Sequence, residues 1–445
     1  MNEKIQIIFG LLGGLAVFIY GMNMMSECLQ KAAGDKMKSI LALLTKNPIL
    51  GVLAGALTTA VLQSSSATTV MAIGFVSAGL MNLPQAISII FGANIGTTMT
   101  AQIIAFKISD YIYVIIFIGF LISFVTKSEK VKSIGQTIFA FGLLFLGIET
   151  MGDVMKPLAS SPVFTDLIGR VAHIPVLGVA VGTVMTLVVQ SSSATIAVLQ
   201  NFASQPGPDG VTSILGLAGA IPILLGDNIG TTITALLASI GQSKDAKRTA
   251  VAHCIFNISG CFLFIWFVKP FAALIQNISP KGPEIEAISR QIANAHTVFN
   301  ITMTLIWVCL IKLMVKIVMT LIPDGKKGVE DPGSPIYLDE NIISQPAAAL
   351  QLVAKEIFRM SDQVGDILKK TIELVKNEEV KSIDGLKENG EQVERLGKCI
   401  TEYLAALFSS GSLTEQQAAQ TASLMCVLSD VERMGTLSVE IAECM

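Results

Sequence analysis

Charged side chains are scarce in this chain, and the two signs nearly balance. Asp, Glu, Lys and Arg make up 15% of the 445 residues, and the formal net charge is −3 at pH 7. A nucleic-acid-binding surface needs an excess of basic groups, so this composition argues against a nucleic-acid partner. With 52% apolar residues and a mean hydropathy of +0.64, the chain has the composition of an integral membrane protein.

Residues that form disulfides, bind metals or act as nucleophiles are also few. The seven cysteines show neither the paired spacing of a disulfide framework nor the spacing of a metal site, so we expect free thiols. No arrangement of nucleophile and base is visible, and the sequence therefore predicts no enzyme. The apolar run after residues 1–4 is long and lacks a small-residue cleavage site, which favours a first membrane span over a signal peptide.

The composition changes sharply near Pro323. Residues 324–334 are rich in Gly, Pro and charge, which is typical of a linker. We therefore expect a membrane domain over residues 1–323 and a soluble helical domain over residues 335–445. In the second domain the apolar residues recur at helical spacing, for example at Ile357, Met360, Val364, Ile367 and Leu368.

The membrane domain contains the same polar phrase twice. Gln-Ser-Ser-Ser-Ala-Thr occupies residues 63–68 and returns at residues 190–195. Hydrocarbon penalises polar side chains unless they have partners or line a wet cavity, so packing alone does not explain two matched clusters. A second phrase, Gly-x-Asn-Ile-Gly-Thr-Thr, follows each copy at residues 92–98 and 226–232. We infer that the membrane domain consists of two sequence repeats.

The segment before the first polar phrase is too short to cross a membrane. Residues 48–62 would form about 22 Å of helix at ~1.5 Å per residue, whereas a crossing needs about 30 Å of apolar length. We therefore expect the chain to turn at the serines and to run back over residues 67–80 as a re-entrant hairpin. Such irregular backbone is tolerated where it is buried in protein or lines a cavity. The alternative is a single long helix with a polar stripe.

Basic residues between the apolar segments predict the orientation of the spans. If these residues lie in the cytoplasm, the first hairpin enters from the cytoplasm and the second from outside. The two repeats, at about residues 6–126 and 134–270, are then inverted relative to each other, an extra span at about residues 292–322 follows, and the C-terminus is cytoplasmic. The basic groups are Lys31, Lys36, Lys38 and Lys46; Lys127, Lys130 and Lys132; Lys244, Lys247 and Arg248; and Lys326 and Lys327.

The predicted fold class is therefore all-α. It is a polytopic membrane protein of two inverted repeats, each with a re-entrant helical hairpin, joined to a cytoplasmic helical bundle. Inverted repeats with broken helices at mid-depth are a secondary-transporter design.

The hairpin tips offer groups for both an anion and a hard cation. The helix after each tip is expected to begin near Ser66 or Ser193, so its N-terminal amides face the tip and favour negative charge. Serine hydroxyls, glutamine carbonyls and unwound backbone carbonyls supply oxygen ligands that suit Na⁺. Neither hairpin contains Lys or Arg, so dipoles and co-bound cations would have to balance the anion. We therefore expect the anion to bind in a sodium-dependent way.

The second repeated phrase has two interpretations. Its glycines permit helix unwinding that turns polar side chains toward the tips, or they simply allow close helix packing. Asp227 replaces Ala93 of the first copy and lies at membrane depth, which makes it a candidate cation ligand. A proton carrier and a structural acid are the alternatives. His253 and His296 each precede an Asn by four residues, and we expect them to make ordinary polar contacts.

These motifs resemble those of the type II sodium–phosphate cotransporter family in its bacterial form. The doubled serine phrase, residues 228–232 and the segment 253–260 carry the resemblance, which covers about residues 6–322. It implies a cell-membrane protein that binds inorganic phosphate and Na⁺ between the tips and transports them by alternating access, without a cofactor. The motif match implies phosphate-binding roles for Gln63, Ser64, Ser65, Ser66, Gln190, Ser191, Ser192 and Ser193. The expected sodium ligands are Ser65, Thr68, Asn94, Thr97, Thr98, Ser192, Thr195, Asp227, Asn228, Thr231 and Thr232.

The sequence departs from this family in one respect. Animal members have an element like His253–Asn257 after both hairpins, whereas the first repeat here lacks it, since residues 109–120 contain no His. Sodium stoichiometry and electrogenicity are therefore not implied by the resemblance.

The C-terminal region is similar to a PhoU-like helical domain, and we expect that domain to be incomplete. Residues 429–435, Ser-Asp-Val-Glu-Arg-Met-Gly, carry the likeness. It implies phosphate regulation, with a homodimer or a regulatory partner through residues 335–445. Thr436 stands where that family often has an acid, so no metal site other than for Na⁺ is expected. The alternatives to sodium-coupled symport are a membrane phosphate sensor acting through this domain, phosphate export by the same fold, and an anion channel.

Overall fold

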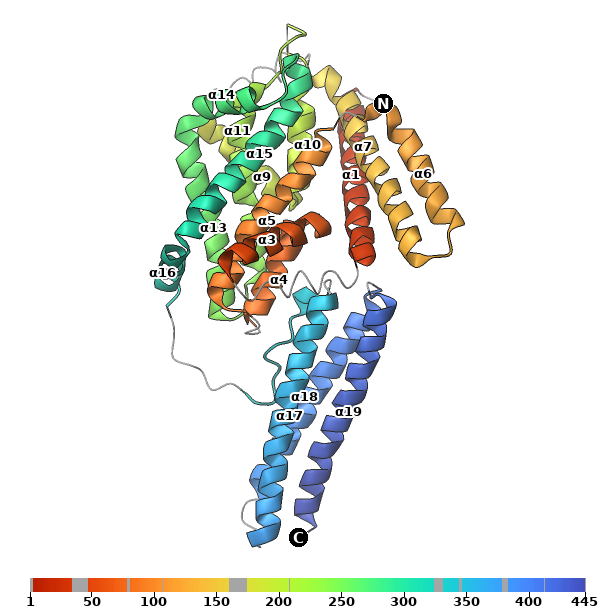
Figure 1. Ribbon diagram of the computed structural model, residues 1–445, viewed down its shortest axis with the longest axis vertical. Helices are drawn as coiled ribbons and strands as arrows, with labels where there is room; N and C mark the ends of the chain where they lie inside the picture. The colour runs from red at the N-terminus through yellow and green to blue at the C-terminus, as the bar shows by residue number, and fades with distance from the viewer. Residues whose placement is uncertain are drawn as a thin grey trace. The chain divides into compact units, whose positions relative to one another are not determined.

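The computed structural model describes residues 3–33, 47–77, 81–106, 108–159, 174–207, 209–323, 331–343, 346–377, 383–411 and 413–444 (Figure 1). Several features predicted above lie outside these ranges, namely Lys36, Lys38, Lys46, Lys326, Lys327, residues 78–80 of the first hairpin and residues 324–330 of the linker. Within them the chain forms α-helices and short 3-10 turns, and β structure is confined to the isolated bridge between Pro206 and Ser213. The prediction of an all-α fold is confirmed.

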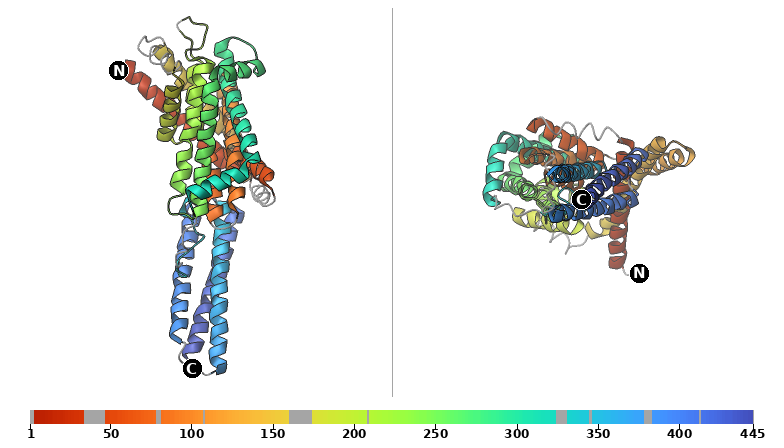
Figure 2. Two further views of the ribbon diagram at one scale, coloured as in Figure 1. Left: turned by 90° about the vertical axis from the view of Figure 1, so that its left-hand side faces the viewer. Right: turned by 90° about the horizontal axis from the view of Figure 1, so that it is seen from below.

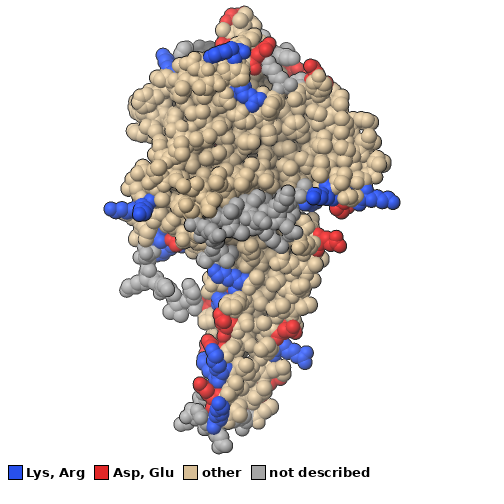
Figure 3. All heavy atoms as spheres, viewed as in Figure 1, with Lys and Arg blue, Asp and Glu red and all other residues tan. Residues whose placement is uncertain are grey.

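Six helical segments of the described chain are long and apolar enough to cross a membrane. They lie in α1 (Glu3–Ala33), α5 (Leu83–Ile104), α7 (Glu129–Ala159), α11–α12 (Gly216–Gly230 and Thr232–Ala238), α13–α14 (Lys244–Phe264 and Val268–Ile278) and α15 (Glu284–Cys309). Shorter apolar helices are α3 (Pro48–Leu62), α4 (Ser65–Ser77), α6 (Ile112–Val125) and α9 (Pro175–Val189), and α10 spans Ser192–Ala203. Outside the C-terminal helices, the space-filling view shows a broad surface that is almost free of charged groups, as a lipid-facing belt requires (Figure 3).

Helices α1 and α7 pack side by side in antiparallel directions (Figure 1). A Cβ atom on Gly14 would lie 2.9 Å from the carbonyl oxygen of Gly147, and one on Gly21 would lie 2.9 Å from that of Ala140. The contacted residue on α7 has a lower number when the glycine on α1 has a higher number, so the two helices run in opposite directions. Small residues let the two backbones approach this closely. Gly21 and Met25 of α1 match Gly147 and Met151 of α7 at a spacing of 126 residues, close to that of the polar phrases, so the interface pairs each helix with its own counterpart.

Each repeat also packs its first hairpin helix against its most buried apolar span in the same way. A Cβ on Gly55 of α3 would overlap the carbonyl oxygen of Ile89 of α5, and one on Gly182 of α9 would overlap that of Ile223 of α11. The reverse contacts are equally close: Gly92 lies against the backbone of Val52, and Gly226 against that of Val179. The contact between α3 and α5 in the first repeat therefore corresponds to the contact between α9 and α11 in the second.

The last membrane-domain segments differ from the expected single span at residues 292–322. Helix α15 begins earlier, at Glu284, and ends at Cys309, and a separate helix α16 covers Ile311–Leu321. Helix α16 buries Met314 and Val318 on one face and exposes Lys312 and Lys316 on the other. Such an amphipathic helix suits a membrane surface better than a hydrocarbon interior, which explains the break.

The C-terminal helices belong to a second compact unit, which comprises residues 73–82, 242–246 and 322–445. In it α17 (Pro346–Asn377), α18 (Ile383–Ser409) and α19 (Glu415–Glu443) form a bundle of long helices with charged groups along its surface (Figures 2 and 3). The predicted core positions of α17 are buried, except that Leu368 is 37% exposed. The exact domain limits given above stay a prediction.

A buried acid ties the segment before this bundle to α17. Glu356 accepts hydrogen bonds from the backbone N–H groups of Ile336 (2.9 Å) and Tyr337 (2.6 Å) and forms an ion pair of 2.6 Å with Arg359. Arg359 also donates to the carbonyl oxygen of Ser334 at 2.7 Å. The part of the predicted linker that the structure describes, residues 331–334, therefore packs on the bundle.

Candidate functional site

Both polar phrases form a break between two helices. Helix α3 ends at Leu62 and α4 begins at Ser65, and between them Gln63 has a left-handed backbone with φ 51°. The second copy repeats this geometry, since Gln190, with φ 53°, separates α9 from α10. Among the described residues these two glutamines are the only non-glycine residues with positive φ. Such a conformation is costly for a residue with a Cβ and persists only where the surrounding structure requires it, commonly at functional sites.

The first serine of each tip caps the helix that follows. Ser64 Oγ accepts a hydrogen bond from the N–H of Ala67 (3.2 Å), and Ser191 Oγ accepts one from Ala194 (3.3 Å). These oxygens satisfy helix N–H groups that would otherwise lack a partner. The helices begin at Ser65 and Ser192, one residue earlier than expected. The second serine of each tip is therefore in the first helical turn, and Ser65, Ser192 and Ser193 are buried.

A pair of threonines links the two arms of each hairpin. The hydroxyl oxygens of Thr59 and Thr68 lie 2.8 Å apart in the first hairpin, and those of Thr186 and Thr195 lie 3.1 Å apart in the second. Thr68 and Thr195 are fully buried. Both were predicted as sodium ligands, and the structure places each one turn beyond its tip, beside the opposite arm.

The second half-site contains a buried carboxylate that the first half-site lacks. Asp227 has no exposed surface, and its Oδ1 accepts a hydrogen bond of 2.7 Å from the hydroxyl of Thr186. Its Oδ2 has no hydrogen-bond partner within the described chain. A buried ionised carboxylate is costly without a partner, so this free oxygen is suited to a cation. Ala93 stands at the matched position of the first repeat.

The two tip glutamines have different surroundings. Gln63 is buried; its Oε1 accepts from the hydroxyl of Thr100 at 2.9 Å, and its Nε2 donates to the carbonyl oxygen of Ala60 at 2.5 Å. Gln190 is exposed. Identical sequence phrases therefore give one tip that is anchored by its glutamine and one whose glutamine faces outward.

The threonines of the second repeated phrase use their hydroxyl protons within their own helices. Thr97 donates to the carbonyl oxygen of Ala93 at 3.0 Å, and Thr231 donates to that of Asp227 at 2.9 Å. Thr98 and Thr232 donate to carbonyl oxygens three residues back, those of Ile95 and Ile229, both at 2.8 Å. A hydroxyl that donates in this way keeps lone pairs, so it remains able to bind a cation.

The backbone of the second repeated phrase stays close to helical in both copies, and Thr231, between α11 and α12, has φ −60° and ψ −25°. In the second repeat α11 ends at Gly230 and α12 begins at Thr232. In the first repeat α5 continues without interruption through Asn94 to Ile104, which favours the close-packing interpretation there. The side chain of Asn94 bonds to its own helix, because Nδ2 donates to the carbonyl oxygen of Ile90 at 2.8 Å.

Hydrogen bonds also connect the two repeats. The hydroxyl of Thr234 in α12 donates to Ser66 of the first tip at 3.3 Å. In the other direction, Gln200 of α10 donates to the carbonyl oxygen of Ala101 in α5 at 3.1 Å. Each hairpin therefore contacts the long buried helix system of the opposite repeat, as a site shared between the repeats requires.

The two histidines make polar contacts, as expected, but the sequence did not predict that their partners are the matched asparagines of the two repeats. His253 Nε2 lies 3.3 Å from Asn94 Oδ1, and His296 Nε2 lies 3.3 Å from Asn228 Oδ1. The likeness of their sequence settings extends to the phrase Ala-His-x-x-Phe-Asn-Ile, which occurs in both α13 and α15. The element that the first repeat lacks in sequence therefore has its second copy in α15.

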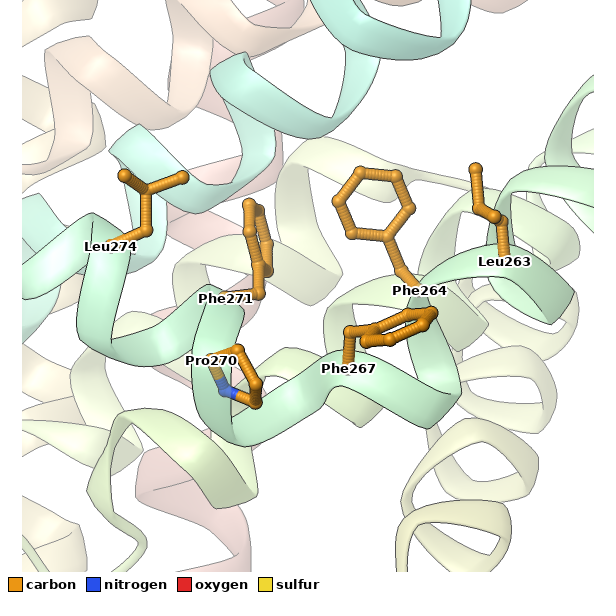
Figure 4. A pocket seen from close by; sticks show the side chains of 6 residues that line it. All are labelled: Leu263, Phe264, Phe267, Pro270, Phe271 and Leu274. Atoms are coloured by element: carbon orange, nitrogen blue, oxygen red, sulfur yellow. The ribbon is translucent and has the colours of Figure 1, made fainter.

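An apolar cavity of about 300 Å³ lies at the bend between α13 and α14 (Figure 4). Its lining is Leu263, Phe264, Phe267, Pro270, Phe271 and Leu274. These side chains have no hydrogen-bonding groups for a phosphate or a hydrated cation. This cavity shares no lining residue with the hairpin tips and is not the candidate site.

The sequence predicts no site for a metal other than Na⁺. Within the described residues, no cluster of three or more His, Cys, Asp or Glu side chains could hold a metal ion. All seven cysteines are free thiols, as the spacing predicted.

Comparison with protein families adds an independent finding. A model of the Na⁺/Pi-cotransporter family matches the chain twice, over residues 17–153 and 151–279, and a model of the PhoU domain matches residues 357–445. The double match agrees with the two repeats identified from the sequence. No solved structure matches the chain.

Individual relatives are similar to most or to part of the chain. An uncharacterised protein of Bacillus subtilis, YqeW, is 34% identical over 263 residues, which cover 59% of this chain and 83% of that protein. The putative inorganic phosphate export protein YjbB of Escherichia coli K12 is 24% identical over 97% of this chain and 78% of its own length. The human sodium-dependent phosphate transport protein 2B is 33% identical over 142 residues, which are 30% of this chain and 19% of that protein.

Proposed function

The chain belongs to the Na⁺/Pi-cotransporter family, whose members are transporters rather than enzymes, and on this premise we propose that it couples inorganic phosphate movement to Na⁺. Phosphate and Na⁺ bind between the two hairpin tips, and alternating access exposes them to either side of the cell membrane. The observation that carries this proposal is the pair of left-handed glutamines, Gln63 and Gln190, at matched helix breaks.

The charges of the tips support coupled binding. Phosphate meets the N-terminal turns of α4 and α10, where free amides and serine hydroxyls donate hydrogen bonds. Lys and Arg are absent from residues 48–77 and 175–203, so a dianion has no fixed cation there. Na⁺ at Asp227 and the nearby hydroxyl oxygens supplies the missing positive charge. Phosphate affinity therefore rises when Na⁺ is bound, and the reverse follows by linkage.

The proposal includes the inverted arrangement of the repeats. The antiparallel packing of α1 on α7 supports it, because matched Gly21 and Gly147 occupy equivalent places in one interface. An antiparallel pair of equivalent helices is related by a two-fold axis across the helices, and such an axis in the membrane plane exchanges the two sides. The hairpins then enter from opposite sides and are re-entrant.

Uptake of radiolabelled phosphate into proteoliposomes tests the proposal. An inward Na⁺ gradient should drive concentrative uptake that an equal K⁺ gradient does not. Ser65→Ala and Ser192→Ala should each raise the half-saturating phosphate concentration about tenfold, the effect of losing one hydrogen bond to a charged group. Ser410→Ala, in the C-terminal unit, serves as the control. Equal uptake with Na⁺ and K⁺ would contradict sodium coupling.

Net export is the second direction that the same site supports. The putative export protein YjbB is similar to 97% of this chain, including the C-terminal unit. Coupling is reversible, so loading the vesicles with Na⁺ and phosphate should give sodium-dependent efflux. The gradients across the host membrane then set the net direction.

The PhoU-domain match favours regulation through residues 335–445, with a homodimer or another protein as partner. A chain ending at residue 334 distinguishes the two functions. A transporter keeps sodium-dependent flux without the helical domain, whereas a membrane sensor loses its function.

A further inference from the structure

Two histidines connect the C-terminal membrane helices to the two halves of the candidate site. The phrase Ala-His-x-x-Phe-Asn-Ile places His253 on α13 and His296 on α15. His253 contacts Asn94 of the first repeat and His296 contacts Asn228 of the second, both at 3.3 Å and both buried. Asn94 and Asn228 are matched residues of the repeats, so the same His–Asn contact occurs once in each half. We call each of these two contacts a latch.

The hydrogen-bond network defines which atoms of each asparagine face the histidine. Asn94 Nδ2 donates to the carbonyl oxygen of Ile90 at 2.8 Å, and Asn228 Nδ2 donates to that of Leu224 at 2.9 Å. The amide nitrogen is thereby used within the helix, and the oxygen Oδ1 faces the imidazole. An amide oxygen only accepts hydrogen bonds, so the proton of the contact belongs to the histidine Nε2.

The other imidazole nitrogen identifies the form of the ring. His253 Nδ1 and His296 Nδ1 have no hydrogen-bond partner among the described residues, and both rings are almost fully buried. A proton on Nδ1 would create a charged imidazolium with an unpaired N–H group in a membrane interior, which is strongly unfavourable. The neutral ring protonated at Nε2 satisfies the contact to the asparagine and leaves only a lone pair at Nδ1.

We propose that His253 and His296 are positioning residues for sodium binding, and that both hold this neutral, Nε2-protonated form. Each imidazole determines the rotation of the helix that carries the proposed ligands: Thr97 and Thr98 follow Asn94 by about one turn, and Thr231 and Thr232 follow Asn228. Residues that hold the ligands of an ion in place affect the affinity for that ion although they do not contact it. This inference rests on the proposed sodium site.

The two latches have unequal consequences, because Asp227 directly precedes Asn228 whereas Ala93 precedes Asn94. Loss of the His296 contact also releases the helix turn that holds the buried carboxylate. The effect of changing His296 should therefore exceed that of changing His253.

Transport measurements on paired variants test the positioning role. Leu at either position removes the N–H donor, whereas Gln keeps an N–H group close to the place of Nε2. His296→Leu should raise the half-saturating Na⁺ concentration about tenfold and His253→Leu about threefold, with a smaller change in maximal rate. His296→Gln and His253→Gln should recover most of the affinity. Equal half-saturating Na⁺ in wild type, Leu and Gln variants would overturn the inference.

A control variant separates this role from general packing. Phe256 stacks on Phe91 with ring centroids 5.0 Å apart, which joins the same helices α13 and α5 as the first latch does. Phe256→Leu weakens that packing without removing a hydrogen bond. It should lower the thermal stability of the purified protein and leave the half-saturating Na⁺ concentration within about twofold. A shift in Na⁺ affinity equal to that of His253→Leu would overturn the positioning role.

The ring form can be measured without any transport activity. The chain has three histidines, so ¹⁵N-histidine labelling gives few signals, and a variant of His173 identifies the remaining two. In bilayers at pH 7, His253 and His296 should each show one protonated Nε2 and one unprotonated Nδ1. An Nδ1-protonated ring or an imidazolium would overturn the inference even if sodium-driven uptake is normal. Absent sodium-driven uptake with the expected ring form would instead contradict the proposed function.

Discussion

The two halves of the candidate site have nearly the same backbone and different charges. Both have a 15-residue first helix, a left-handed glutamine, a serine cap and a threonine bridge between the arms. Only the second half has a buried acid, Asp227, where the first has Ala93. In our proposal the duplicated features build the shape of the site, while Asp227, which has no acidic counterpart at residue 93, supplies its charge.

The largest expected effect comes from removing that charge. Asp227→Asn keeps an oxygen that accepts from Thr186, so the fold should be retained, but it loses the anionic partner that we propose for Na⁺. We expect sodium-dependent phosphate uptake to fall at least tenfold, equivalent to about 1.4 kcal/mol or more, when measured at a sodium concentration below half-saturation.

An exposed acid provides the control for this substitution. Asp209 lies in the loop between α10 and α11, where the hydroxyl and backbone N–H of Thr212 lower its pKa to about 2. It is therefore ionised at pH 7, and Asp209→Asn removes the same charge far from the membrane interior. Uptake should be unchanged. If the Asp227→Asn and Asp209→Asn variants show equal sodium-dependent phosphate uptake, the Asp227 carboxylate does not contribute to transport.

Removing the threonine bridges should have a smaller effect on transport than removing Asp227, and it compares the two half-sites directly. Thr186→Val removes the donor to Asp227 Oδ1, whereas Thr59→Val removes only a contact between neutral hydroxyls. Losing a hydrogen bond to a charged group costs about 1.5–3 kcal/mol, compared with about 1 kcal/mol for a neutral pair. Sodium affinity measured by uptake should therefore fall about tenfold or more in Thr186→Val and less than fivefold in Thr59→Val. Equal losses would show that the two bridges have the same role.

Much of this architecture follows from local sequence. The length of residues 48–62 and the doubled polar phrase predicted the helix break correctly, because a turn that leaves backbone groups unpaired needs polar residues nearby. Of the two interpretations of the second repeated phrase, close packing holds at Asn94, because Gly92 and Gly96 lie against α3 and the helix stays intact. A glycine permits both outcomes, and only the neighbouring helix decides between them.

Other features of the site depend on contacts between distant segments. The sequence gives no reason for Gln63 to be buried and Gln190 exposed, because the two phrases have the same letters. Thr100, 37 residues after Gln63, donates to the Gln63 side chain, whereas the matched Thr234 of the second repeat donates to Ser66 of the opposite tip. The His–Asn contacts likewise join residues 159 and 68 positions apart, and no local pattern predicts which asparagine each histidine meets.

The smallest expected effect concerns the two left-handed glutamines themselves. Glycine adopts positive φ without the Cβ penalty of about 1 kcal/mol, at the cost of greater freedom in the unfolded chain. At position 190 the side chain is exposed, so Gln190→Gly should change the free energy of unfolding by less than about 0.5 kcal/mol. Gln63→Gly also loses the bond from Thr100 and should be destabilising by about 1 kcal/mol. Thermal unfolding of the purified variants measures this difference, and equal shifts would mean that the anchored and outward-facing glutamines are interchangeable for the fold.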